Sequence, residues 1–141
     1  MRDHLGEDAD QVFVQRMVPP GVDLRIRIIS EGELGPVVTV GFGGLQAEAI
    51  GDESSRLAPV SSAAARSMLD ETRASAALDD GREERFADAI VRVAQLASDH
   101  PRLIELDLNP VILADNSCWV TDASVRLSPL VRAEPAMRRL E

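Results

Sequence analysis

The side chains best able to do chemistry in this chain are the oxygen-bearing groups of Asp107, Asn109 and Asp122. The first two belong to the run Glu105-Leu106-Asp107-Leu108-Asn109-Pro110, and Asp122 follows Asn109 by thirteen residues. Carboxylate and amide oxygens are ligands that a hard cation such as Mg²⁺ prefers in proteins. A fold that brings Asn109 beside Asp122 would therefore let the two side chains hold one divalent cation.

A β-hairpin would bring these two side chains together. Two apolar-rich runs, 103–113 and 118–127, flank the segment Ala114-Asp115-Asn116-Ser117, whose short polar side chains favour a turn. A turn centred between Asp115 and Asn116 places Asn109 directly opposite Asp122, with their Cβ atoms roughly 4.5–5.5 Å apart. The predicted hairpin therefore permits a metal site.

The two faces of this hairpin differ in character. Asp107 shares a face with Asn109, because side chains alternate along a strand. The other face is expected to enter the core, and it carries Leu106, Leu108, Ala123 and Val125. A second interpretation remains open, because antiparallel sheets often expose one face to water and the polar face would then hold no metal.

The rest of the sequence predicts further strands and two helices. Apolar or alternating runs predict strands at 12–18, 22–29, 37–40 and 45–50, with a turn at Pro19-Pro20-Gly21 and a loop at 41–44. Helices are predicted from 61 to about 72, after capping serines, and from 82 to 98, where apolar residues recur at three- and four-residue spacing. The predicted fold class is α+β, a mainly antiparallel sheet with two helices.

Composition excludes several classes of function. The net charge of −9 and the scarcity of aromatic residues argue against a nucleic-acid partner. All fifteen basic residues are arginine, which excludes the lysine of a P-loop. Cys118 is the single cysteine and is expected to be a small core residue. No run is long and apolar enough to predict a membrane span or a signal peptide, so the expected location is the cytoplasm.

Several motifs occur in an order that is typical of one enzyme family. They are Val12-Phe13-Val14-Gln15-Arg16-Met17-Val18, Gly21-Val22-Asp23-Leu24, Gly35-Pro36-Val37-Val38, Gly43-Gly44, Arg56-Leu57-Ala58-Pro59, the run from Glu105 to Pro110, and Asp122-Ala123. With these motifs, residues 11–128 resemble the C-terminal lobe of the ATP-grasp portion of NDP-forming acyl-CoA synthetases, relatives of the succinyl-CoA synthetase β subunit. Residues 1–10 are then a polar N-terminal segment. Residues 129–141 form a tail, and its end resembles that of family members fused to acetyltransferase domains.

The resemblance implies metal ligands and a catalytic candidate. In the family, the asparagine and aspartate at the positions of Asn109 and Asp122 hold Mg²⁺ on the phosphates of the nucleotide. Asp107, in the same motif, is the candidate catalytic residue. The predicted hairpin agrees with this ligand pair.

The resemblance also implies contacts to ATP or ADP. A strand similar to the hinge of the family would place Val14 and Gln15 beside the base and ribose. Asp23 stands where relatives commonly have glutamate. Gly43 and Gly44 resemble the loop near the phosphoryl-transfer centre, where backbone N–H groups approach an anion because no Cβ intervenes.

The reaction implied by the resemblance joins acyl-CoA, a nucleoside diphosphate and phosphate to give the acid, CoA and a nucleoside triphosphate, through a phosphohistidine on another domain. The N-terminal lobe should precede residue 11, so the chain is expected to be incomplete as an enzyme. Its expected partners are that lobe and the CoA-binding domains, in the same parent chain or another. Arg27 replaces a usual glycine and Gly51 a common lysine.

Two alternatives to this function remain open. The lobe could serve as a non-catalytic regulatory or assembly module, and its exposed sheet edges would then favour pairing with a partner or with a second copy. The chain could also be an unrelated α+β domain whose acidic hairpin face is solvated.

Overall fold

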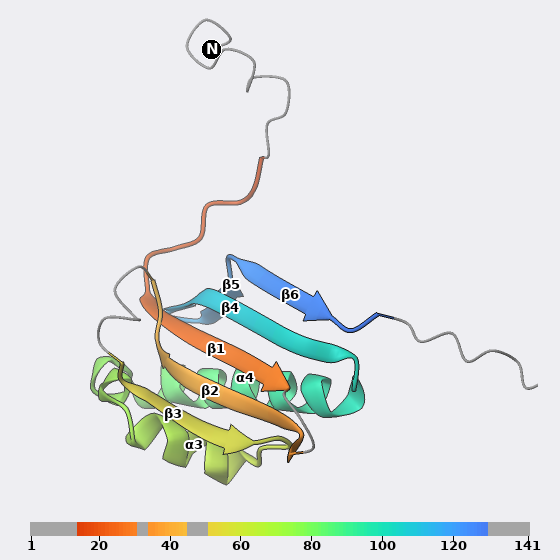
Figure 1. Cartoon of the computed structure of the whole chain (residues 1–141). Helices are drawn as coiled ribbons and strands as arrows, with labels where there is room; N and C mark the ends of the chain where they lie inside the picture. Colours follow the sequence, from red (N-terminus) through yellow and green to blue (C-terminus); the bar gives the residue numbers. More distant parts are fainter. Residues whose placement is uncertain (1–13, 31–33, 45–50, 130–141) are drawn as a thin grey trace, which may run out of the picture.

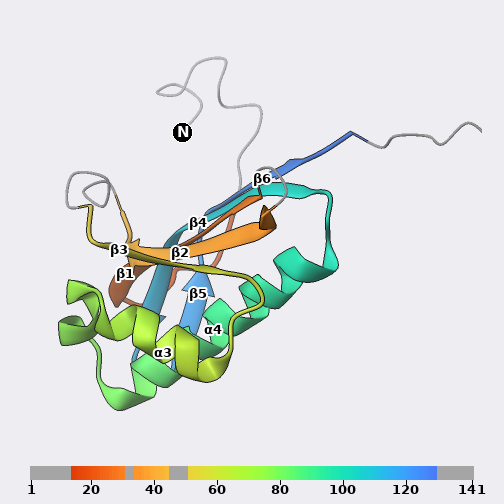
Figure 2. The ribbon, with the colours of Figure 1, turned by 60° about the horizontal axis from the view of Figure 1, so that its bottom comes forward.

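A six-stranded antiparallel sheet covered on one face by two helices makes up the described part of the chain, residues 14–30, 34–44 and 51–129 of the computed structural model (Figure 1). The elements are β1 (Val22–Ser30), β2 (Pro36–Phe42), β3 (Glu53–Leu57), α3 (Ser62–Asp70), the 3-10 helix η3 (Arg73–Ala77), α4 (Asp80–Asp99), β4 (Leu103–Ala114), β5 (Ser117–Val120) and β6 (Ala123–Leu127). Figure 2 shows α3 and α4 on the same side of the sheet. The predicted α+β fold class is confirmed.

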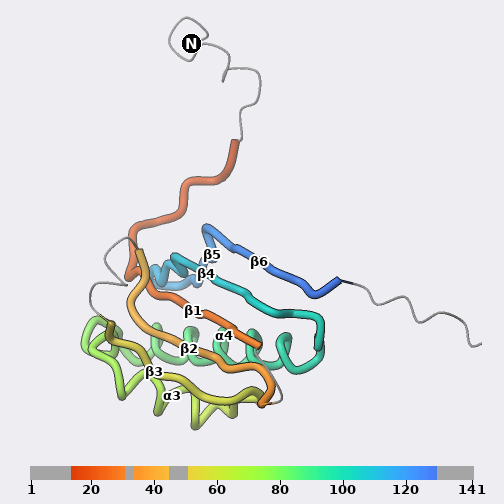
Figure 3. Tube along the Cα trace, viewed as in Figure 1, coloured from red at the N-terminus to blue at the C-terminus, as the bar shows by residue number. Residues whose placement is uncertain are grey.

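The strand order brings distant parts of the sequence together. Neighbouring strands run β3-β2-β1-β4, and the other edge of β4 pairs with β5 and then with β6. Figure 3 shows β1 lying between β2 and β4. Leu24 pairs with Val111 and Ile26 with Leu108, so β4 carries one extra residue between these pairs. Such a bulge changes the direction of side chains locally, and here it falls at Asn109 and Pro110.

The core lies between the sheet and the helices. Alternate residues of β1 (Leu24, Ile26 and Ile28) are fully buried, and Phe86 and Ile90 of α4 pack into the same cluster. Both helices begin at side-chain caps, because Ser61 Oγ accepts from Ala64 N at 3.2 Å and Asp79 Oδ1 accepts from Arg82 N at 2.8 Å. The two predicted helices are therefore confirmed.

The face of the sheet away from the helices is polar, and we call it the open face. It carries Asp23, Arg25 and Arg27 of β1 and Glu105 and Asp107 of β4, which alternate with buried residues. Arg25 pairs with Asp107, and Glu105 accepts from both Arg27 (3.1 Å) and Arg126 of β6 (3.0 Å). These ion pairs link three adjacent strands.

Glu105→Gln is expected to weaken the acid sensitivity of folding. Hydrogen bonds from Arg126 and then from Arg27 hold the pKa of the Glu105 carboxyl below its ordinary value of 4.5. A lowered folded pKa contributes stability above about pH 4.5, and that stability is lost as the pH falls through the folded pKa. The melting temperature of wild type should therefore drop more steeply between pH 6 and 3 than that of Glu105→Gln. Glu53→Gln on β3 is the control, and equal slopes in wild type and Glu105→Gln would contradict the expectation.

The strand predicted at 12–18 is wrong for the residues that the structure describes. Residues 14–21 form no helix or strand, and the side chains of Val14 and Met17 are 93% and 91% exposed. A strand is stabilised by pairing and by burial of one face, and this segment has neither among the described residues. Pro19 and Pro20 also lack the N–H groups that a ladder needs.

The predicted burial of one face of the hairpin is confirmed for the residues of β4 and is wrong for those of β6. Leu106 and Leu108 are buried, whereas Ala123 is exposed and Val125 is 57% exposed. The reason is the position of β6 at the edge of the sheet. Val125 and Leu127 instead line an apolar groove of about 350 Å³ with Leu96 near the end of α4.

The strand predicted at 45–50 lies outside the described residues. β2 pairs with β1 on one edge and with β3 on the other. The sequence does not predict β3, because Glu53-Ser54-Ser55-Arg56-Leu57 lacks apolar alternation. Its buried residue is Ser54, whose hydroxyl donates to Glu71 Oε2 at 2.6 Å. Neither α3 nor α4 is both long and apolar enough to cross a membrane.

Candidate functional site

Five of the predicted site residues come together at one end of the sheet. Asp23 opens β1, Gly43 and Gly44 follow β2, Asn109 lies in the bulge of β4, and Asp122 lies between β5 and β6. We call this group the strand-end cluster. Four separate segments of the chain contribute to it, because antiparallel neighbours place the start of one strand beside the end of the next.

Asn109 and Asp122 are opposed as the predicted hairpin requires. The pairs Val111 with Val120 and Leu108 with Ala123 flank them in the predicted register. Asn109 N donates to Asp122 O at 3.3 Å, although the strand is interrupted there and β5 and β6 are separate. The hairpin register is therefore confirmed.

Asp122 belongs to the open face. Alternate residues share a face in an extended chain, so Asp122 lies on the side of Ser124 and Arg126. Arg126 bonds Glu105 of the open face. Asp122 is exposed and Asn109 is half-buried, so the cluster faces solvent.

The two glycines bring β2 close to Asn109. Gly43 N donates to Asp23 O at 2.8 Å, and a Cβ at Gly43 would lie 2.4 Å from Leu24 O, so only glycine fits there. Gly44 has a φ of +79°, and its N–H donates to Asn109 Oδ1 at 2.8 Å. In this structure the Gly44 N–H therefore binds the asparagine rather than an external anion, and it fixes which way the Asn109 carbonyl points.

The donor set of the strand-end cluster fits a hard cation. A carbonyl oxygen has two lone pairs, so Asn109 Oδ1 can accept from Gly44 N and still offer a pair to a metal. The Asp122 carboxylate supplies charge, and the Asp23 carboxylate lies beside Gly44, with Oδ2 3.7 Å from the position of a Cβ there. Mg²⁺ usually takes one or two carboxylates and completes its octahedron with water and substrate phosphates. Oxygen donors of these kinds could supply part of such a shell. Among the described residues, no group of three or more His, Cys, Asp or Glu side chains is placed to hold a metal ion.

Asp107 is held by an arginine that sequence analysis did not single out. Arg25 Nε donates to Asp107 Oδ1 at 2.8 Å and Arg25 Nη2 to Oδ2 at 2.5 Å. The two side chains are only 9% and 22% exposed, so this is a bidentate, largely desolvated pair. The pairing of β1 with β4 creates it, and no local pattern in the sequence reveals that register. The catalytic role of Asp107 stays a prediction.

One of the two predicted hinge residues, Gln15, lines a cleft beside β5. This small cleft, of about 150 Å³, is also lined by Arg16, Trp119 and Thr121, and the side chains of both Val14 and Gln15 are exposed. The Arg16 guanidinium lies 5.3 Å from the centre of the Trp119 ring. Arg16 and Trp119 were not predicted as site residues, although Trp119 is the sole tryptophan.

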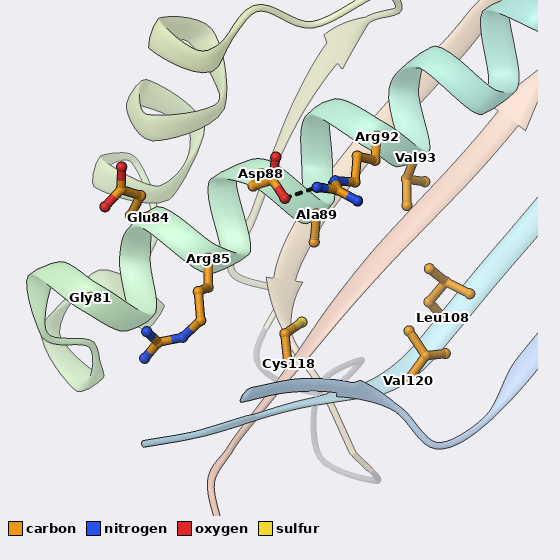
Figure 4. A pocket seen from close by; sticks show the side chains of 10 residues that line it. All are labelled: Gly81, Glu84, Arg85, Asp88, Ala89, Arg92, Val93, Leu108, Cys118 and Val120. Atoms are coloured by element: carbon orange, nitrogen blue, oxygen red, sulfur yellow. Dashed lines mark ion pairs between the residues drawn. The ribbon is translucent and has the colours of Figure 1, made fainter. Parts of the chain in front are cut away.

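A larger cavity, of about 680 Å³, lies on the helix side of the hairpin. Figure 4 shows Cys118 and Val120 of β5 and Leu108 of β4 facing Ala89 of α4 across it. Burial raises the pKa of the Cys118 thiol, and the nearby Arg85 guanidinium opposes this only in part. A thiol with a raised pKa is a poor nucleophile at neutral pH. Cys118 is half-buried and packs against the core rather than within it, so the prediction of a small core residue holds only in part.

Two known proteins similar to this chain are ADP-forming acetate–CoA ligases. The chain is 35% identical over 117 residues to an ADP-forming acetate–CoA ligase I of Archaeoglobus fulgidus. The aligned residues cover 79% of this chain and 17% of that protein. The chain is 34% identical over 128 residues to the β subunit of the ADP-forming acetate–CoA ligase I of Pyrococcus furiosus, covering 85% of this chain and 55% of the subunit. The chain therefore spans about half or less of these relatives.

The fold has a solved counterpart. The dinucleotide forming acetyl-coenzyme A synthetase 1 of Ca. Korarchaeum cryptofilum, in complex with coenzyme A and Mg-AMPPCP, superposes with a TM-score of 0.74 at 34% identity, covering 79% of this chain and 55% of that one. A family model described as ATP-grasp domain matches residues 1–127. On the family match over most of its length, the similar relatives and the superposed fold, the chain belongs to the ATP-grasp domain family.

Proposed function

We propose that this chain is the lobe of an NDP-forming acyl-CoA synthetase that holds the magnesium side of a bound nucleotide. The observation that carries this proposal is the strand-end cluster, in which Asn109, Asp122 and the Gly43-Gly44 turn meet from separate strands. Relatives that are ADP-forming acetate–CoA ligases, and a similar structure in complex with Mg-AMPPCP, support the choice of nucleotide and metal.

The residues of the cluster have distinct roles in this proposal. Asn109 Oδ1 and the Asp122 carboxylate would hold the cation, and the Gly44 N–H keeps the amide oxygen aimed at it. When bound, Mg²⁺ neutralises charge on the phosphates and favours phosphoryl transfer. Asp107 is held rigid by Arg25 two residues from Asn109, where it can position the ligand strand.

We assign the acyl-CoA chemistry to other parts of such a synthetase, carried by the same polypeptide or another. The relatives are up to several times longer than the matched segment, which leaves room for those parts. The apolar groove formed by Leu96, Val125 and Leu127 offers a surface on which another part of the synthetase would pack. The cytoplasm, where nucleotide and CoA are available, is the compartment that this proposal implies.

Magnesium-dependent binding of ATP to the isolated chain tests the proposal. Calorimetric titration of ATP should show binding with Mg²⁺ present and at least about 10-fold weaker binding with EDTA, because phosphates and protein share the ion. Mg²⁺ without nucleotide should bind weakly. Equal affinity with and without Mg²⁺, or no binding at millimolar ATP, would contradict the proposal and favour a non-catalytic assembly module.

A further inference from the structure

We propose that Trp119 is the platform on which the base of the bound nucleotide stacks, an inference that rests on the proposed function. Its starting point is the direction of the Trp119 side chain. Cys118 and Val120, its neighbours on β5, line the cavity shared with α4 (Figure 4). Because side chains alternate along a strand, Trp119 points to the opposite side, which is the open face.

The pairing register places Trp119 in line with the strand-end cluster. Trp119 pairs with Ile112 of β4, and Ile112 pairs with Asp23 of β1. Gly43 N donates to Asp23 O. Paired residues of neighbouring strands therefore form a line across the sheet, which runs from Gly43 through Asp23 and Ile112 to Trp119. Along the chain, Trp119 precedes Asp122 by three positions, and the break between β5 and β6 lies between them, so strict alternation of faces does not continue from one to the other. Three chain positions span at most roughly 10 Å. A nucleotide whose phosphates lie at Asp122 can therefore reach the ring with its base.

The cleft around the ring suits a base. Its volume is about 150 Å³, and it is lined by Gln15, Arg16, Val18, Trp119, Thr121 and Val120, the last of which also lines the cavity shared with α4. Whole drug-sized ligands occupy pockets of roughly 300–1,000 Å³, so this cleft has room for one ring system and not for an entire nucleotide. The Gln15 amide offers both donors and an acceptor to the edge of a base.

The ring is held in place, and one of its faces carries a displaceable group. Trp119 Nε1 donates to Ser117 Oγ at 2.7 Å, which fixes the orientation of the indole. Arg16 is exposed, and its guanidinium covers the ring at 5.3 Å. A cation–π contact at an exposed site is weak. We therefore expect a base to take the place of the guanidinium on this ring face, since stacking on tryptophan tolerates any base.

The experiment separates base contacts from phosphate contacts. Trp119 is the sole tryptophan and the chain has no tyrosine, so intrinsic fluorescence reports on this ring alone. With Mg²⁺ present, ATP should change the Trp119 emission, and tripolyphosphate, which has no base, should bind without a comparable change. Calorimetry should show about 5- to 150-fold weaker ATP binding for Trp119→Ala, with tripolyphosphate affinity unchanged. Trp119→Phe, which keeps a stacking face, should retain most of the affinity.

Two failures of this experiment are distinguishable. ATP binding that is Mg²⁺-dependent but equally tight in wild type and Trp119→Ala, without a change in emission, would overturn the stacking inference and leave the proposed function standing. No Mg²⁺-dependent binding of either ATP or tripolyphosphate would overturn both. A loss of tripolyphosphate binding in Trp119→Ala would also overturn the inference, because it would show that the substitution acts on the phosphate site or on the fold.

Discussion

Asp122→Asn is expected to weaken Mg²⁺-dependent ATP binding by about 10- to 100-fold or more. Removing a residue that only hydrogen-bonds to a metal ligand typically lowers metal affinity by about 10- to 100-fold, and Asp122 is proposed to be a ligand itself. The substitution keeps the size of the side chain and removes its charge, which is the only formal charge in the Asn109–Asp122 ligand pair. Asp122 is exposed, and its backbone oxygen would still accept from Asn109 N at 3.3 Å. The fold should therefore survive, and calorimetry with ATP at saturating Mg²⁺ measures the loss.

Asp70→Asn is the matched control for this prediction. It makes the same chemical change at an exposed carboxylate at the end of α3, in a part of the chain that contributes nothing to the strand-end cluster. Its ATP affinity should equal that of wild type. If Asp122→Asn bound ATP with Mg²⁺ as tightly as Asp70→Asn, Asp122 would not be a metal ligand.

Arg25→Met is expected to lower the free energy of unfolding by about 2–4 kcal/mol, because it leaves the carboxylate of a largely desolvated pair without its bidentate partner. The Arg25 and Asp107 side chains are 9% and 22% exposed. The bond between them also joins β1 to β4 across a separation of 82 residues. Urea denaturation of the variant and wild type measures the difference.

A double variant tests the cause of that loss. Arg25→Met/Asp107→Leu replaces both charges by apolar groups, which often costs little where breaking one partner costs much. The double variant should therefore lose less stability than the sum of the single variants. A change within about 0.5 kcal/mol for Arg25→Met, as is usual for surface substitutions, would show that the pair does not stabilise the fold.

Local signals in the sequence were enough for the helices and for the hairpin. Ser61 and Asp79 cap helices where predicted, because a cap side chain bonds an N–H only three residues away. The turn at Asp115 and Asn116 sets the register that opposes Asn109 to Asp122, since a tight turn fixes every pair that follows it. The predicted metal pair depends on this short-range geometry alone.

Local signals misled about the strand at 12–18 and about burial at β6. Residues 14–18 form no strand and Val14 is exposed, whereas β6 is a strand as predicted but Val125 is 57% exposed. Burial depends on which element covers a residue, and a short window of sequence does not contain the covering element. β3 was missed for the same reason, since its polar residues pair with β2 and contact the end of α3.

By itself the sequence determined the caps, the turn and the opposition of Asn109 to Asp122, because each depends on contacts within about a dozen residues. Only the tertiary structure decided three contacts. Arg25 forms an ion pair with Asp107, the Gly44 N–H donates to Asn109 Oδ1, and the Arg16 guanidinium lies over the Trp119 ring. The paired residues are far apart in the sequence: 82 positions for Arg25 and Asp107, 65 for Gly44 and Asn109, and about a hundred for Arg16 and Trp119. The contacts form when β1 and β2 dock against β4 and its hairpin, which depends on the packing of the whole core.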